Sequence, residues 1–295
     1  MNIITINDKK YPAILKKIGK DAPKQLYYKG VWPFDTAQGK NDIFNNCLAV
    51  VGSRRLTSYG KQVIEKLVTE IAAAGITIVS GFMYGGDAMA HKTAIRAGGR
   101  TIAVMPCGIE RIHPEFQQDL YVEILNNNGL IISEYEGEMM PVNWTYPRRN
   151  RIVAGLSKAV LVVEAGLKSG SLITANFAKK FHRKVFAVPG PITSEVSKGT
   201  LQLIKEGAEM VVSAKDILDF FGVYGVGQAM SNRTSPVQRA EGIEEKILDQ
   251  LRREPLGIDD LARALGIPAS KLGTIISLME LKGIIEQDSG KYCLP

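Results

Sequence analysis

Residues 48–55 read Leu-Ala-Val-Val-Gly-Ser-Arg-Arg, an apolar run that stops at a glycine and two arginines. A short, continuous apolar run is typical of a strand that is buried on both faces, as in a parallel sheet. Ser58 is positioned to cap a helix that continues to about Ala74, and Thr77–Ser80 forms the next apolar run. A strand, a helix and a second strand in this order predict a βαβ unit.

The same alternation continues to residue 221. Further strands are expected at Thr101–Met105, Gly129–Ser133, Ala159–Val163, Lys184–Val188 and Glu209–Val212. Helices are expected over 87–97, 116–126 and 150–156, from Ser171 onward, and over 199–206 and 216–221. The fold class is therefore α/β, and residues 48–221 are expected to form a Rossmann-like, doubly wound domain with a mostly parallel sheet.

The remaining segments have different patterns. Residues 1–47 are less regular and are expected to form an N-terminal extension packed on the sheet. Residues 222–240 are rich in Gly, Ser, Gln and Asn and predict a linker. Residues 241–295 contain three short helical patterns followed by a hairpin pattern. This order predicts a small C-terminal winged-helix domain.

Composition describes an ordinary globular chain. Of the 295 residues, 45% are hydrophobic and 23% are charged. No apolar run approaches the roughly 18 residues that cross a bilayer, and the first ten residues lack the apolar core of a signal peptide. The three cysteines are far apart, which disfavours a disulfide framework. We expect a soluble, cytoplasmic protein with no membrane partner.

Charge is divided unevenly between the two expected domains. Residues 241–295 contain ten acidic and seven basic side chains, a net charge of −3. The first 240 residues contain 30 basic and 20 acidic side chains, a net charge of +10. A basic domain favours polyanionic partners, above all nucleic acids or nucleotides.

Several candidate binding loops follow the expected strands. In an open α/β sheet, ligands bind at the carboxyl ends of the strands, where helix N-termini present free N–H groups. The loop after the first strand offers guanidiniums that can bind phosphate oxygens, and a later loop offers small and hydroxyl residues at a helix start. Residues 146–151 combine an aromatic side chain with three arginines, a mixture that is typical of proteins that bind single-stranded nucleic acid. The candidate DNA- or phosphate-binding residues are Gly52, Ser53, Arg54, Tyr146, Arg148, Arg149, Asn150, Arg151, Ser169, Gly170, Ser171 and Thr174.

Patterns typical of catalysis are missing from the sequence. There is no GxxxxGK[ST] motif, and Gly52 and Gly60 are too far apart for GxGxxG. The three histidines are scattered without metal-ligand spacing. Asp87 and His91 share one helix face, where they could form an acid–base or metal pair or fix the helix start; Glu134 and Glu164 end strands and could reach the cleft. We expect no catalytic residues, no metal and no cofactor.

Taken together, these motifs resemble the DprA (Smf) family of bacterial DNA-processing proteins. The similarity covers roughly residues 10–220 and a winged-helix tail of the kind found in many members. The stretches that carry it are 49–54, 80–81, 86–87, 90–91, 101–104, 133–134, 146–152, 154–157, 163–165, 169–174, 187–190, 199 and 207–208, with 11–12 and 26–30 in the extension.

The resemblance implies single-stranded DNA binding by the Rossmann-like domain, homodimerisation, and loading of the RecA recombinase during natural transformation or recombination. It implies no catalysis. The chain departs from the family's usual pattern at 82–87, at 113–117 and at Tyr146, which replaces a phenylalanine. A helix-hairpin-helix module of the kind often found before the family's sheet is not expected, because only 47 residues precede the first predicted strand of the parallel sheet.

One alternative function belongs to a different class. Nucleotide-binding proteins and phosphoribohydrolases that act on nucleoside 5′-monophosphates share the Rossmann-like architecture and a glycine-rich loop near Gly85. Their PGGxGT motif is followed by a catalytic glutamate, whereas residues 169–174 of this chain are followed by Ala175, Asn176 and Phe177. Release of a free base from AMP would distinguish this enzyme from a DNA-binding protein.

Overall fold

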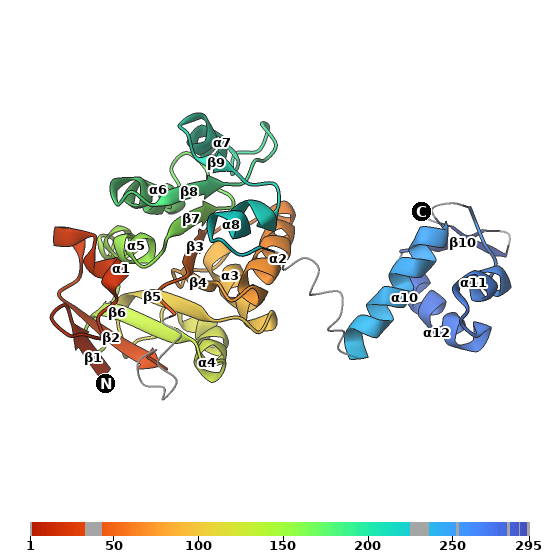
Figure 1. The fold of residues 1–295 in the computed structure, drawn as a ribbon, viewed down its shortest axis with the longest axis horizontal. Coiled ribbons are helices and arrows are strands. Elements are labelled where there is room, and N and C mark those ends of the chain that lie inside the picture. Colours follow the sequence, from red (N-terminus) through yellow and green to blue (C-terminus); the bar gives the residue numbers. More distant parts are fainter. Residues whose placement is uncertain are drawn as a thin grey trace. The chain divides into compact units, whose positions relative to one another are not determined.

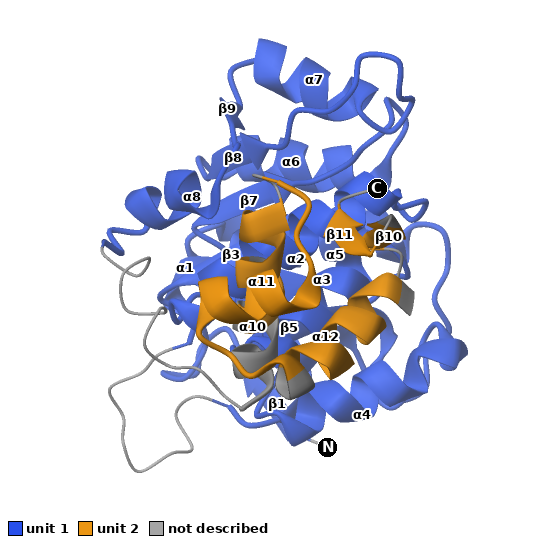
Figure 2. Ribbon diagram, turned by 90° about the vertical axis from the view of Figure 1, so that its right-hand side faces the viewer, with its two compact units in different colours: residues 1–224 blue, residues 225–295 orange. Residues whose placement is uncertain are grey.

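The computed structural model describes residues 2–32, 43–224, 236–251, 254–281, 284–288 and 290–293. The chain divides into two compact units, residues 1–224 and 225–295 (Figure 2). Helix α10 (Pro236–Leu251) begins inside the stretch 222–240 that the sequence predicts as a linker. Residues 225–235 of that stretch lie outside the described residues.

The first unit contains one nine-stranded sheet in the order β1-β2-β6-β5-β4-β3-β7-β8-β9 (Figure 1). Strands β3 to β9 are parallel to one another, whereas β2 is antiparallel to both β1 and β6. The mostly parallel, doubly wound fold is therefore confirmed. The strands are β1 (Asn2–Thr5), β2 (Gln25–Gly30), β3 (Cys47–Val51), β4 (Thr77–Ser80), β5 (Thr101–Gly108), β6 (Leu130–Tyr135), β7 (Ala159–Val162), β8 (Lys184–Ala187) and β9 (Glu209–Met210).

Helices cover both faces of this sheet (Figure 1). Alternate residues of β3 point to opposite faces, so that Ala49 and Val51 enter one core cluster while Leu48 and Val50 enter another. Helices α1, α5, α6 and α7 pack on the first face and α2, α3 and α8 on the second. Their bounds are α1 (Ala13–Lys16), α2 (Ser58–Ala73), α3 (Gly86–Arg96), α4 (Gln118–Asn126), α5 (Thr145–Gly155), α6 (Gly170–Lys180), α7 (Lys198–Lys205) and α8 (Ala214–Phe220).

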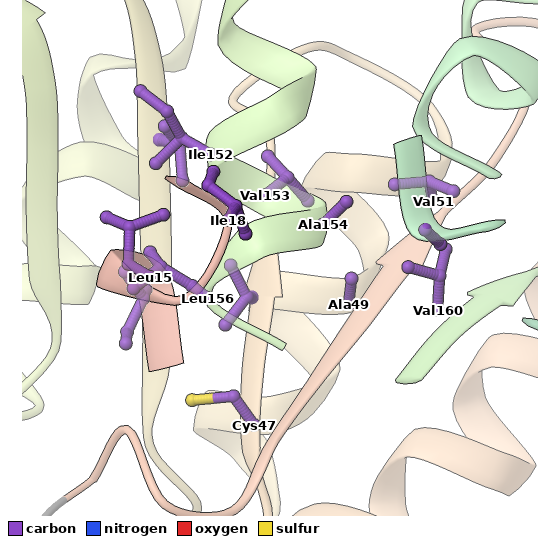
Figure 3. Close-up of a cluster of buried hydrophobic side chains, with 14 of the residues drawn as sticks. Leu15, Ile18, Cys47, Ala49, Val51, Ile152, Val153, Ala154, Leu156 and Val160 are labelled. Carbon is purple, nitrogen blue, oxygen red and sulfur yellow. The ribbon is translucent and has the colours of Figure 1, made fainter. Parts of the chain in front are cut away.

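The N-terminal extension both packs on the sheet and enlarges it. Strands β1 and β2 continue the sheet beyond β6, with Tyr27 opposite Ser133. The segment between them lies against α5, and Figure 3 shows Leu15 and Ile18 beside Ile152. A Cβ atom on Gly155 would come within 2.8 Å of Leu15, so the absence of a side chain there allows this close packing.

The C-terminal unit has three helices and a two-stranded hairpin. Helices α10, α11 (Ile258–Leu265) and α12 (Ala269–Leu281) precede β10 (Glu286–Asp288) and β11 (Lys291–Cys293). Leu272, Ile276 and Met279 of α12 are buried in this unit's own core, as their helical spacing predicts. Three helices and a hairpin around one core confirm the winged-helix prediction.

No helix in the described ranges is both long and apolar enough to cross a lipid bilayer.

Candidate nucleic-acid interface

A large cleft lies where the order of the strands reverses. From β3 the chain proceeds through β4, β5 and β6 on one side, and then returns to place β7 on the other side of β3. The loops after β3 and β7 therefore separate, and the crevice outside the carboxyl ends of such strands is where open α/β sheets bind ligands. A cleft of about 1110 Å³ occupies this position, and both loops line it.

Most of the residues predicted from the sequence line this one cleft. They come from three segments, the loop after β3, the helix α5 and the start of α6. Ten of the twelve candidates are lining residues, namely Gly52, Ser53, Arg54, Tyr146, Arg149, Asn150, Ser169, Gly170, Ser171 and Thr174.

Arg148 and Arg151 are the two candidates outside the cleft. The sequence predicts the arginine run just before a helix, but α5 begins at Thr145 and contains the whole run. Residues three and four apart share a helix face, so Tyr146, Arg149 and Asn150 face the cleft while Arg148 and Arg151 face away from it. The Arg151 guanidinium donates to Glu134 at 2.6 Å, and Arg148 Nε lies 3.3 Å from the same carboxylate. These two side chains anchor α5 to β6.

Hydrogen bonds join the three segments to one another. The Ser171 hydroxyl donates to the carbonyl of Gly52 at 2.9 Å, and the Asn150 amide donates to the carbonyl of Gly170 at 3.2 Å. The Ser53 hydroxyl accepts from the backbone N–H of Arg55 at 3.0 Å and fixes the turn after β3. The serine and asparagine side chains therefore shape the cleft through contacts within the protein.

A close backbone contact explains the paired glycines before α3. A Cβ atom on Gly86 would come within 2.7 Å of Gly52 Cα, so only a glycine allows the two backbones to meet there. The N–H of Gly86 also donates to the carbonyl of Ser53 at 3.1 Å. The glycines seat the start of α3 against the loop after β3.

Three exposed cations line the cleft without an ionic partner. Arg54, Arg55 and Lys168 are exposed, and none of them forms a salt bridge with any residue that the structure describes. The Arg54 guanidinium lies 5.9 Å from the centre of the Tyr84 ring and 5.6 Å from that of Tyr146. Cation–π contacts of this length hold the guanidinium in place and leave its N–H donors available for phosphate oxygens.

Arg149 is a buried arginine at the base of the cleft. It is 4% exposed and donates to the carbonyl of Val104 at 2.5 Å. Burial lowers the pKa of Arg149, and the nearby carboxylate of Asp87 opposes that change. Burial likewise raises the pKa of Asp87, which the charge of Arg149 opposes. The pair supports the loop at Gly81, where a Cβ atom would come within 2.2 Å of the guanidinium.

The ring of Tyr146 is half-buried at the edge of the cleft. Its hydroxyl lies 2.9 Å from His113 Nε2, and the two rings meet edge to face. Tyr146 therefore presents an aromatic surface beside Arg54, and the contact between its hydroxyl and His113 fixes the position of the ring.

The side chains that the sequence offered for catalysis have structural partners. Both oxygens of Glu164 accept from Thr57, from its N–H at 2.9 Å and from its hydroxyl at 2.5 Å. Glu134 pairs with the two arginines of α5, so neither glutamate lines the cleft. No group of His, Cys, Asp and Glu that could hold a metal ion is present among the described residues.

His91 is part of the packing behind the cleft. It is fully buried, with Nε2 2.6 Å from the carbonyl of Gly81 and Nδ1 2.7 Å from the Thr101 hydroxyl. Burial lowers the pKa of His91 to about 4, so the ring is neutral at pH 7 and its Nε2–H donates to Gly81. The Asp87–His91 spacing thus marks the start of α3 and is not an acid–base pair.

Several cleft residues are absent from the candidates chosen by sequence. Arg55 and Lys168 belong to the quoted loops and their positive charge was a usable signal. Asn143, Asp87 and Glu195 also line the cleft. Glu195 pairs with Lys198 at 2.5 Å and comes from the loop 189–200, which the sequence indicates as a candidate loop because it follows a predicted strand.

Comparisons with known proteins identify the family of this chain. The chain is 39% identical over 249 residues to Protein Smf of Escherichia coli K12, covering 83% of this chain and 67% of that protein. The solved structure of DprA from Streptococcus pneumoniae matches with a TM-score of 0.66 and 37% identity, covering 74% of this chain and 73% of that one. DprA from Helicobacter pylori, whose structure is described in terms of its single-stranded DNA binding mode, matches with a TM-score of 0.64 and 32% identity. The match covers 75% of this chain and 96% of that one. The family profile described as DNA recombination-mediator protein A matches residues 2–222, and that of the DprA winged helix domain matches residues 231–291. This chain therefore belongs to the DprA/Smf family of DNA-processing proteins.

Proposed function

We propose that this protein binds single-stranded DNA in the cleft at the carboxyl ends of β3 and β7, without sequence preference and without catalysing a reaction. The observation that carries the proposal is the set of three exposed cations around one cleft, Arg54, Arg55 and Lys168, which form no salt bridge with the residues that the structure describes. Such charges interact with phosphates in preference to bases, so they give affinity that is independent of sequence.

Two further features of the cleft suit a single strand. Helix α6 begins at Gly170 on its wall, and the positive end of its dipole favours a bound phosphate there. The ring of Tyr146 gives a surface on which an unpaired base stacks. A duplex keeps its bases paired and cannot use this ring.

Replacement of Arg54 tests the proposal. For wild type, log K for an oligonucleotide should fall with log salt, with a slope of about 0.7 for each neutralised phosphate. Arg54→Ala should weaken binding to all sequences about equally and reduce this slope by about 0.7. Fluorescence anisotropy at several salt concentrations measures both quantities.

Arg96→Ala is the matched control, because Arg96 is an exposed arginine in the last turn of α3 that does not line the cleft. It should bind like wild type. Equal affinities for Arg54→Ala and wild type would show that the strand lies elsewhere, and tighter binding of a duplex than of its single strand would refute the proposal for the cleft.

Family membership supports a wider role. We propose that the protein protects single-stranded DNA and loads the RecA recombinase on it during natural transformation or recombination, acting as a cytoplasmic homodimer. Light scattering measures the mass of the particle, and filament formation by RecA on strands coated with a single-strand-binding protein measures loading. A monomeric mass would contradict the homodimer. Filament formation at the same rate with and without this protein would contradict RecA loading.

The enzyme alternative makes a separate prediction. Hydrolysis of a nucleoside 5′-monophosphate requires a carboxylate near the ribose, and the first turn of α6 contains no acidic residue. Incubation with AMP should therefore release no adenine. Release that depends on Asp87 would support the hydrolase instead.

A further inference from the structure

Two exposed aromatic rings contact each other beside the cleft. Tyr84, in the loop before α3, is 43% exposed, and Phe116, in the 3-10 turn Glu115–Gln117, is 73% exposed. Their ring centres are 6.2 Å apart and the planes are tilted by 49°. Neither ring belongs to a core cluster of the described residues, so packing within the protein does not account for them.

These rings continue the surface of the cleft. Tyr84 does not line the cleft itself, but its neighbour Met83 does. The Arg54 guanidinium lies close to two rings, 5.9 Å from the centre of Tyr84 and 5.6 Å from that of Tyr146. Contacts therefore link Tyr146 and Arg54, which line the cleft, to Tyr84 and Phe116, which do not.

The loops that hold the two rings are fixed at several points. The Gln117 amide donates to the carbonyl of Phe82 at 2.9 Å, which ties the turn that contains Phe116 to the loop that contains Tyr84. The N–H of Met83 donates to Asp87 at 3.3 Å. The rings are thus presented to solvent by a rigid support, which reduces the entropy lost when a flat ligand stacks on them.

We propose that Tyr84 and Phe116 form a second base-stacking platform, which holds an unpaired nucleobase of the strand after it leaves the cleft past Arg54. This inference rests on the proposed function. The platform has a cation at its cleft end, which favours the phosphate that follows such a base, and its rings accept any base because every base has a flat face.

The test compares oligothymidylates of increasing length on wild type, Phe116→Ala and Phe116→Trp. Wild-type affinity should rise with length and then show a further step when the strand reaches the platform. Phe116→Ala should lose this step, which we expect to be about 5- to 100-fold, while its affinity for the shortest binding strand stays unchanged. Phe116→Trp should retain the step, because it keeps a ring.

Abasic substitution locates the platform along the strand. Removal of one base at the position that contacts Phe116 should weaken wild type by the same factor and should leave the Phe116→Ala variant unaffected. Tyr224→Ala is the matched control, because Tyr224 is 76% exposed and does not line the cleft; it should behave like wild type. Because Phe116 is so exposed, its replacement should leave the circular dichroism spectrum and the melting temperature unchanged.

Equal affinities of Phe116→Ala and wild type at every length would overturn the platform and leave the cleft proposal intact. The same holds if Phe116→Ala changes the mass of the particle without changing DNA affinity, because the rings would then face a second copy of the chain. Failure of wild type to bind any single strand would overturn both proposals together.

Discussion

Tyr146 has two sets of contacts that substitution can separate. Its ring lies beside the Arg54 guanidinium, and its hydroxyl lies beside His113. The ring is available to a base, whereas the hydroxyl contributes only to the position of the ring.

We therefore expect Tyr146→Phe to retain most of the affinity for single-stranded DNA and Tyr146→Ala to lose about 1–3 kcal/mol of binding free energy, the usual contribution of one stacked base. Titration of both variants with a labelled oligonucleotide measures the difference. If both variants bind as wild type does, the ring has a packing role only.

For single residues, the sequence indicates which side chains could bind DNA, but it does not show which of them are already paired within the protein. Arg54 and Arg151 each follow a polar residue, Ser53 and Asn150, and the sequence indicates both as candidates. Arg54 is exposed, whereas Arg151 is buried against Glu134, seventeen positions earlier in the chain. Only the pairing of strands and helices in space brings that carboxylate to one arginine and not to the other.

Among the secondary-structure elements, helix α5 has the largest influence on the cleft. One face of the helix lines the site and another face is held to β6 by Glu134. The carboxylate and the Arg151 side chain are 12% and 10% exposed, so this ion pair is largely buried, whereas Arg148 is half exposed.

Removal of one partner from a buried ion pair leaves an uncompensated charge and typically costs about 3–5 kcal/mol, while an exposed pair contributes about 0–1 kcal/mol. Arg151→Ala should therefore lower the free energy of unfolding by roughly 3 kcal/mol, and Arg148→Ala by less than about 1 kcal/mol. Urea denaturation measures both.

The folded fraction of each variant should bind single-stranded DNA with wild-type affinity, because neither side chain lines the cleft. A large loss of affinity in Arg148→Ala without loss of stability would place that arginine on the DNA.

The predicted elements differ in how well the sequence indicates them. The buried parallel strands are continuous apolar runs, so β3, β4 and β7 were found within a residue or two. Helix α5 begins five residues before the predicted start at Asn150, because Pro147 is tolerated in the first turn of a helix and the polar run has no apolar period. The sequence predicts only an extension where β1 and β2 lie, since both antiparallel strands are partly exposed and neither is a continuous apolar run.

For the molecule as a whole, charge separates the roles of the two units. The segment 241–295 has a net charge of −3. Among its described residues, Arg263 is paired with Asp260 at 2.7 Å, and the apolar residues of α12 form the core. A helix that enters a DNA groove needs cations for its phosphate contacts, so this winged helix is better suited to a protein partner.

A chain that ends at Tyr224 should therefore bind single-stranded DNA within about threefold of the full chain, since the cleft and its cations all lie in the first unit. Gel shift of both proteins at the same salt concentration measures this. A loss of tenfold or more, or tight duplex binding that disappears with the truncation, would assign DNA contacts to the winged helix.

The position of β2 in the sheet has a consequence for biosynthesis. Tyr27 pairs with Ser133, so the pair formed by β1 and β2 cannot join the rest of the sheet until β6 has been translated. A ribosome adds about 5–20 residues each second, and the emerging N-terminal segment must wait several seconds for its partner. During that time Leu15, Leu26 and Trp32, which are buried in the finished protein, are open to chaperones. This edge of the sheet therefore cannot be completed before residue 133 has been translated.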